Sequence, residues 1–122
     1  MALVMPDELA PGSAPTVLAG DLLAPYIWPI EVASAARSAV RRKRMSIDLA
    51  QATTLAVQAF GVEVRPEASE SASYYLQLAS RYGLTPWDAL YIDLALKGQH
   101  GLASKDQAMI AVAERLGLTV YQ

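Results

Sequence analysis

The stretch LTPWDALYIDLA, residues 84–95, carries both the strongest helix signal and the strongest chemical signal in the chain. Pro86 suits the first helical position, where its missing N–H costs nothing, and Thr85 before it can cap the helix. The following residues are mostly apolar, which predicts a largely buried helix. Asp88 falls in the first turn, near the positive end of the helix dipole. This carboxylate is typical of a helix start, and it is also a candidate site residue.

The composition predicts a single globular domain over residues 1–122. Hydrophobic residues make up 53% of the chain and charged residues 18%, which excludes a disordered protein. The absence of cysteine excludes a disulfide framework and a thiolate metal site. The net charge of −2 does not by itself indicate a nucleic-acid-binding protein. With no long apolar run and no recognisable signal peptide, we expect a cytoplasmic location and no membrane contact.

Short apolar segments alternate with helical patterns along the chain. The strand candidates are residues 22–24, 62–64, 102–103 and 118–121. Helices are predicted to begin near Pro29, Ser46, Pro66, Pro86 and Ser104. Short apolar strands separated by helices are typical of a parallel sheet covered on both faces. The pattern therefore predicts an α/β fold in which ligands bind at the carboxyl edge of the sheet.

Several boundaries and one buried face can be predicted in detail. The helix that opens at Pro66-Glu67 should end at Gly83, since glycine suits a helix C-terminus. Ser104 should cap the last helix, with Gln107 completing a capping box, which puts Asp106 in the first turn. The helix capped by Ser46 is predicted to bury the following residues: Leu49, Ala52, Thr53, Ala56, Val57 and Phe60.

Three carboxylates lie near predicted helix starts: Glu31, Asp88 and Asp106. If each helix starts at the same edge of the sheet, these side chains converge there. Crowded carboxylates repel, so one must take up a proton or a cation must fill the site. Mg²⁺ prefers oxygen ligands and can activate water for attack on a phosphodiester. The three acids are therefore a candidate metal site.

Other polar and aromatic residues were weighed against structural explanations. Arg41, Arg42, Lys43 and Arg44 follow a predicted helix, where cations favour the dipole, but their number also suits phosphate binding. His100 is predicted to be a surface loop residue. We expect Trp28, Trp87 and Tyr91 to be packing residues rather than base-stacking groups.

Three motifs occur in the order and spacing found in PIN domains: WPIEV at 28–32, PWDALY at 86–91 and LASKD at 102–106. Over nearly its whole length the sequence resembles the toxin ribonucleases of VapBC toxin–antitoxin pairs. The resemblance implies a three-layer α/β/α sandwich and cleavage of RNA with Mg²⁺ or Mn²⁺. It implies that Glu31, Asp88 and Asp106 are the catalytic, metal-holding residues. It also implies a VapB-like antitoxin partner and a homodimer.

Two further polar residues lie close to these motifs. Asp93 follows Asp88 by five residues, so it faces about 140° away on a helix and is a second-shell or structural group. Ser104 is expected to act as a cap, and its hydroxyl could also reach a metal-bound water. Neither residue belongs to the predicted ligand set.

The beginning of the chain departs from the PIN pattern. PIN domains open with a strand that carries an Asp, and residues 2–8 resemble instead the segment that follows this strand. We therefore expect the first strand to be absent, which would leave a gap in the middle of the sheet. Asp7 and Glu8 are on the wrong side of that strand to replace its Asp. A second chain could fill the gap, so we predict a homodimer with N-terminal helices at its interface.

Three functional hypotheses follow. The first is a metal-dependent endoribonuclease of a toxin–antitoxin pair, with RNA phosphates bound by residues 41–44. The second is a PIN-like binding module that has lost catalysis and pairs with an antitoxin or with itself. The third is a flavodoxin-like or receiver-like domain, which the lack of acidic residues on an early strand disfavours.

Overall fold

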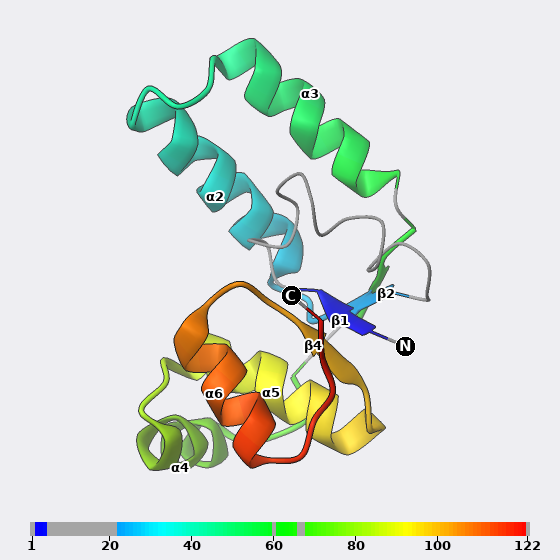
Figure 1. The fold of residues 1–122 in the computed structure, drawn as a ribbon, viewed down its shortest axis with the longest axis vertical. Helices are drawn as coiled ribbons and strands as arrows, with labels where there is room; N and C mark the ends of the chain where they lie inside the picture. The colour runs from blue at the N-terminus through cyan, green and yellow to red at the C-terminus, as the bar shows by residue number, and fades with distance from the viewer. Residues whose placement is uncertain (1, 5–21, 60, 66–67, 122) are drawn as a thin grey trace.

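The structure is a computed structural model, which describes residues 2–4, 22–59, 61–65 and 68–121. The strands are β1 (Ala2–Val4), β2 (Leu22–Ala24), β3 (Glu63–Val64), β4 (Gly101–Ala103) and β5 (Val120–Tyr121). They form one parallel sheet in the order β3-β2-β1-β4-β5. The helices are α2 (Trp28–Arg41), α3 (Ile47–Gln58), α4 (Ala72–Tyr82), α5 (Pro86–Gly98) and α6 (Gln107–Arg115). Figure 1 shows α2 and α3 on one side of the sheet and α4, α5 and α6 on the other, so the predicted α/β layers are confirmed.

The prediction that the middle strand is absent is wrong. Residues 2–4 form β1, which pairs with β2 through Ala2 and Leu22 and with β4 through Leu3 and Leu102. The physical reason is that an empty slot between β2 and β4 would leave buried backbone groups unpaired, and an apolar three-residue segment can satisfy them. The sheet therefore has no gap that a second chain must fill. Asp7 and Glu8 lie outside the described residues.

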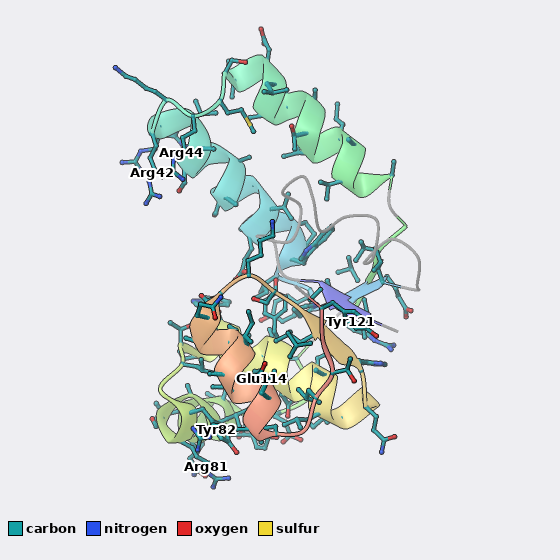
Figure 2. All side chains as sticks on the ribbon, viewed as in Figure 1. Arg42, Arg44, Arg81, Tyr82, Glu114 and Tyr121 are labelled. Atoms are coloured by element: carbon teal, nitrogen blue, oxygen red, sulfur yellow. The ribbon has the colours of Figure 1, made fainter. Side chains whose placement is uncertain are left out.

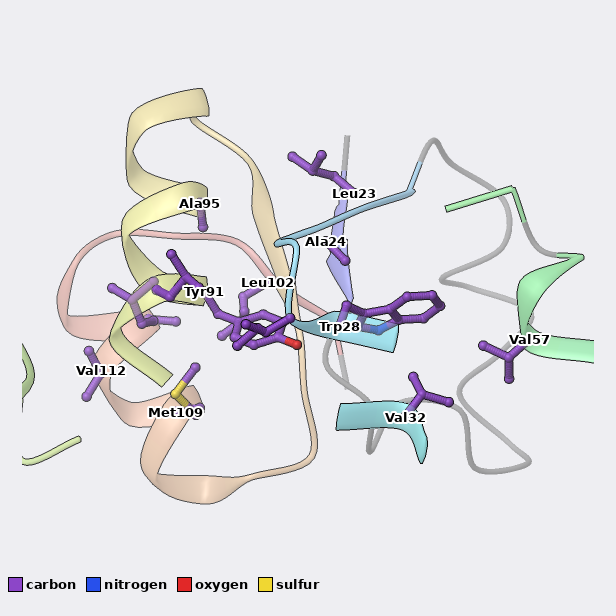
Figure 3. Close-up of a cluster of buried hydrophobic side chains, with 14 residues drawn as sticks. Leu23, Ala24, Trp28, Val32, Val57, Tyr91, Ala95, Leu102, Met109 and Val112 are labelled. Atoms are coloured by element: carbon purple, nitrogen blue, oxygen red, sulfur yellow. The ribbon is translucent and has the colours of Figure 1, made fainter. Parts of the chain in front are cut away.

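Helix α5 is the centre of the core. Thr85 caps it by accepting a hydrogen bond from the Asp88 N–H at 3.1 Å, as predicted. Most of its middle is buried, including Tyr91 and Ile92 at 0% exposure. These side chains pack in one cluster with Leu23 of β2, Leu102 of β4 and residues of α6. Figure 3 shows part of this cluster, with Tyr91 reaching from α5 toward the start of α2.

Helices α2 and α3 form a hairpin whose far end projects away from the sheet (Figure 1). Ser46 caps α3 by accepting from the Leu49 N–H, as predicted. The predicted buried face is wrong in part: Val57 is buried, but Leu49 is 54% exposed, and Ala50 is buried instead. The helix is apolar on several sides, so the side that packs is decided by its neighbour α2. Phe60, another residue of the predicted face, lies outside the described residues.

Two predicted helix starts are also corrected. Helix α4 begins at Ala72 rather than near Pro66, because the Ser71 hydroxyl accepts the Tyr74 N–H and so provides the cap. Helix α6 is capped by Asp106 rather than by Ser104. The C-terminus of α4 agrees with the prediction, since Gly83 adopts φ +67° there. Local side-chain caps therefore set both starts.

Candidate functional site

The carboxyl edge of the sheet gathers the starts of α2, α5 and α6. Helix α2 follows β2, and α6 follows β4, so both begin at this edge. Helix α5 precedes β4 after a short turn and runs opposite to the strands, so its first residue also lies there. All three predicted carboxylates, Glu31, Asp88 and Asp106, are thus carried by elements that meet at one edge.

Glu31 and Asp88 form a carboxylate pair between α2 and α5. Glu31 is half-buried in the first turn of α2, and the Tyr91 hydroxyl donates a hydrogen bond to its Oε2 at 3.2 Å. Burial raises the pKa of the Glu31 carboxyl above its ordinary value, the hydrogen bond from Tyr91 lowers it, and the charge of Asp88 raises it further, with a net increase. The pair is therefore an electrostatically unfavourable arrangement that a cation would relieve.

Asp106 has a different environment. Its Oδ1 accepts hydrogen bonds from the Ala108 N–H at 2.9 Å and the Met109 N–H at 3.2 Å, and its side chain is exposed. Within the described ranges, no group of three or more His, Cys, Asp and Glu side chains is placed to hold a metal ion. In the sheet, β1 lies between β2, which leads into the helix of Glu31, and β4, which leads into the helix of Asp106. The role of Asp106 as a metal ligand therefore stays a prediction.

Ser104 is fully buried, and its hydroxyl accepts the Asp106 N–H at 3.1 Å. This bond fixes the turn that leads from β4 into α6 and so orients Asp106 as the cap. Ser104 acts on the site through backbone geometry. The helix cap is therefore Asp106 and not the predicted Ser104.

Asp93 belongs to a separate ionic cluster on the other side of α5. Its carboxylate is 2% exposed, accepts a hydrogen bond from the Tyr74 hydroxyl at 2.5 Å, and pairs with Lys97 at 3.1 Å. Lys97 also pairs with Glu70 at 2.7 Å and lies 5.1 Å from the centre of the Tyr74 ring. Burial alone would lower the pKa of Lys97, but the hydrogen bonds to Glu70 and Asp93 raise it overall. Of the two predicted roles for Asp93, the structure supports the structural one.

The basic cluster at residues 41–44 lies far along α2 from Glu31. Arg41, Arg42, Lys43 and Arg44 are all exposed at the far end of α2. Figure 2 shows Arg42 and Arg44 projecting there into solvent. Eleven residues separate Glu31 from Arg42, which corresponds to about 16 Å along a helix. A ligand that meets both groups must therefore be extended.

The aromatic predictions are confirmed for two residues and wrong for one. Trp28 is 4% exposed and Tyr91 is fully buried, as packing residues should be. Trp87, in the first turn of α5, is 57% exposed. His100, predicted to be a surface loop residue, is half-buried beside Gly98, and burial lowers its pKa.

The two carboxylates fit a hard divalent cation of the Mg²⁺ type. Mg²⁺ keeps several waters and is commonly bound through one or two carboxylates together with substrate phosphates. Glu31 and Asp88 supply only oxygen donors. The mutual repulsion of their charges is the feature that a cation would remove. The donor set therefore suits a site completed by water and a phosphate ligand.

Sequence reasoning missed two features of this half of the molecule. One is the bond from Tyr91 to Glu31, although Tyr91 lies three residues after Asp88 and so on the same helix face. The other is a groove of about 510 Å³ between α2 and α3, lined by Trp28, Val32 and Val57 among others. Figure 3 shows Trp28 pointing from α2 toward Val57 of α3. No sequence signal marks this groove, because it depends on how the two helices splay.

Comparison with known proteins supports the fold. The sequence matches no protein-family model and no curated protein. Among solved structures, it is similar to the crystal structure of PAE2754 from Pyrobaculum aerophilum, a PIN-domain protein, with a TM-score of 0.75 at 20% identity. The match covers 98% of this chain and 83% of that chain. The fold is therefore PIN-like. In the described residues, no helix is both long enough and apolar enough to cross a membrane.

Proposed function

We propose that this chain is a metal-dependent endoribonuclease, the toxin of a cytoplasmic toxin–antitoxin pair. The observation that carries the proposal is the Glu31–Asp88 pair at the carboxyl edge of a PIN-like parallel sheet. A half-buried carboxylate whose pKa is raised by burial and by a neighbouring acid is a recognised sign of a functional site. The PIN-like fold favours nuclease chemistry over other uses of such a pair.

In this proposal each residue has a defined task. Glu31 and Asp88 hold Mg²⁺ or Mn²⁺, and such an ion supplies an activated water and stabilises charge on the scissile phosphate. Asp106, at the start of α6 on the same edge of the sheet, is the proposed third carboxylate of the site. The exposed basic residues 41–44 bind the RNA backbone at a distance from the cleaved bond. Such a division of tasks suits an extended, single-stranded substrate.

A second candidate function is a PIN-like binding module without catalysis. The observation that favours it is the state of Asp106, whose Oδ1 is engaged by two backbone N–H groups of α6. Among the described residues, this capping role leaves Glu31 and Asp88 as the carboxylates without a helix cap to form. The two functions make opposite predictions for metal binding. If the wild type binds Mn²⁺ and Asp106→Asn abolishes this binding, the enzyme is favoured. If the wild type does not bind at millimolar Mn²⁺, the binding module is favoured.

The proposed partners are an antitoxin protein and a second copy of the chain. The original ground for the homodimer, a sheet without its middle strand, no longer holds, since β1 fills that position. A different ground supports it: α3 exposes large apolar side chains at Ile47, Leu49 and Leu55. Exposed apolar residues gathered on one helix favour association in water. We therefore place the proposed dimer interface at α3.

The central test is cleavage of a single-stranded RNA with Mn²⁺ or Mg²⁺ by the purified chain. Asp88→Asn removes one carboxylate charge and should slow cleavage on the order of 10²-fold, the loss typical when one electrostatic stabiliser is removed. Asp48→Asn is the matched control, because Asp48 also lies in a helix first turn but on α3 and exposed. Equal activity of the wild type and Asp88→Asn would contradict the site assignment.

A further inference from the structure

Tyr91 lies where the two helical layers meet. It projects from α5, its side chain is fully buried, and its hydroxyl donates to Oε2 of Glu31 on α2 at 3.2 Å. The two residues are 60 positions apart in the chain. A buried tyrosine hydroxyl usually finds a hydrogen-bond partner, and here that partner is a carboxylate of the candidate site. Figure 3 shows the ring of Tyr91 directed from α5 toward the start of α2.

Asp88 and Tyr91 act on Glu31 from the same helix face. They are three residues apart on α5, a spacing that brings two side chains together on one side of a helix. Tyr91 therefore donates a hydrogen bond to the same carboxylate that the charge of Asp88 repels. The side chain of Glu31 has several rotatable bonds, and this contact selects one arrangement beside Asp88.

A second tyrosine–carboxylate contact on α5 provides a comparison. The Tyr74 hydroxyl donates to Asp93, and Lys97 neutralises that carboxylate at 3.1 Å. In the part of the chain that the structure describes, no salt bridge involves Glu31. The charge of Asp93 is thus neutralised by Lys97, whereas the contact with Tyr91 holds the Glu31 carboxylate in place without neutralising its charge.

We propose that Tyr91 is a positioning residue, which fixes the Glu31 carboxylate for a divalent cation shared with Asp88. The inference rests on the proposed function, because it takes Glu31 and Asp88 as ligands. Groups that orient a metal ligand by hydrogen bonding commonly contribute 10–100-fold to metal affinity. Tyr91 has this relation to Glu31 and is held rigidly by the surrounding core.

The test measures Mn²⁺ affinity by titration calorimetry, independently of cleavage. Tyr91→Phe keeps the ring and its packing and removes only the hydroxyl, so we expect Mn²⁺ binding to weaken on the order of 10-fold. Tyr74→Phe is the matched control, since it removes a hydroxyl that donates to Asp93, a carboxylate outside the candidate site. That variant should bind Mn²⁺ as tightly as the wild type.

A double variant separates positioning from a general structural effect. If Tyr91 acts through Glu31, then Tyr91→Phe should change Mn²⁺ affinity less than about twofold in a Glu31→Ala background, which has no acceptor for the Tyr91 hydroxyl, followed at millimolar Mn²⁺ by electron paramagnetic resonance. A similar loss in both backgrounds would overturn the positioning role, and so would wild-type affinity in Tyr91→Phe. Absence of Mn²⁺ binding by the wild type would overturn both the cation site and this inference. Tight, Tyr91-dependent binding without RNA cleavage would support the inference and contradict the proposed function.

Discussion

Helices α3 and α5 are similar in length and are both largely apolar, yet they differ sharply in burial. Within α5, Ile92 and Tyr91 are completely buried, and the helix packs against β1, β4 and α4. Within α3, Leu49 and Leu55 are more than half exposed, and the helix packs mainly on α2. Figure 1 shows α5 lying along the sheet and α3 at the outer side of the hairpin.

The difference shows that an apolar helix is buried by what lies opposite it and not by its composition. Helix α5 covers the centre of the sheet, so nearly every side of its middle turns meets protein. Helix α3 packs mainly on α2, and among its side chains whose burial is described, Ala50 and Val57 are the buried ones. The layer that contains α5 should therefore carry most of the stability, and the hairpin layer should be available for association.

The largest expected effect is on the free energy of unfolding. Ile92→Ala creates a cavity in the core and should lower this free energy by about 2–5 kcal/mol. Leu55→Ala removes a side chain that is 62% exposed and should change it by no more than about 0.5 kcal/mol. Urea denaturation followed by circular dichroism measures both values. Comparable losses in the two variants would mean that α3 is buried in solution.

A smaller effect is expected at the ionic cluster that joins α5 to α4. Asp93→Asn removes the charge that Lys97 pairs with and weakens the bond from Tyr74, so the free energy of unfolding should fall by about 1–3 kcal/mol. Glu63→Gln is the control, because its salt bridge with Arg65 at 3.3 Å is solvent-exposed and should contribute less than about 1 kcal/mol. A loss for Asp93→Asn no greater than the control's would show that the cluster is not stabilising.

The sequence predicted α5 well because several local signals agree there. Thr85 and Pro86 mark its start. Because its apolar run is continuous, apolar residues lie on nearly every side of the helix, so burial is predicted regardless of which side faces the sheet. In α3 the same apolar character is spread around the helix, and the choice of Ala50 over Leu49 depends on packing with α2. Local sequence does not contain that information.

The site was predictable only in part, for a reason of topology. The order of strands and helices predicts that Glu31, Asp88 and Asp106 lie at one edge of the sheet. It does not predict which strand separates them, because that depends on the short segment at residues 2–4, whose three residues give almost no periodicity. In the structure, Glu31 interacts with Asp88 of α5, while Asp106 caps α6.

The third prediction concerns association through the hairpin layer. Leu55→Asp places a charge on the proposed dimer interface and should weaken the dimer about 10-fold or more, since burying an unpaired charge is costly. Leu76→Asp is the matched control, because Leu76 on α4 is 61% exposed, almost the same as Leu55 at 62%. Light scattering at micromolar concentration measures the assembly state. An equal effect of both substitutions, or a monomeric wild type, would contradict an interface at α3.

The smallest expected effect is the pH dependence contributed by Glu31, at the junction of the two layers. The pKa of Glu31 in the folded chain lies above its ordinary value of 4.5, chiefly because the side chain is buried. As pH rises from 4.5 through the folded-state pKa, the unfolded chain releases its proton first, so the folded chain loses stability across that window.

Glu31→Gln cannot ionise, yet its amide oxygen can still accept from Tyr91. Without divalent metal, the difference in free energy of unfolding between this variant and the wild type should therefore shift in favour of the variant as pH rises through the window. Above the window this difference should stay constant. Glu114→Gln on α6 is the exposed control for the loss of one glutamate side-chain charge. Urea denaturation at a series of pH values measures both differences, and an unchanging difference for Glu31→Gln would show that burial of Glu31 does not oppose its charge.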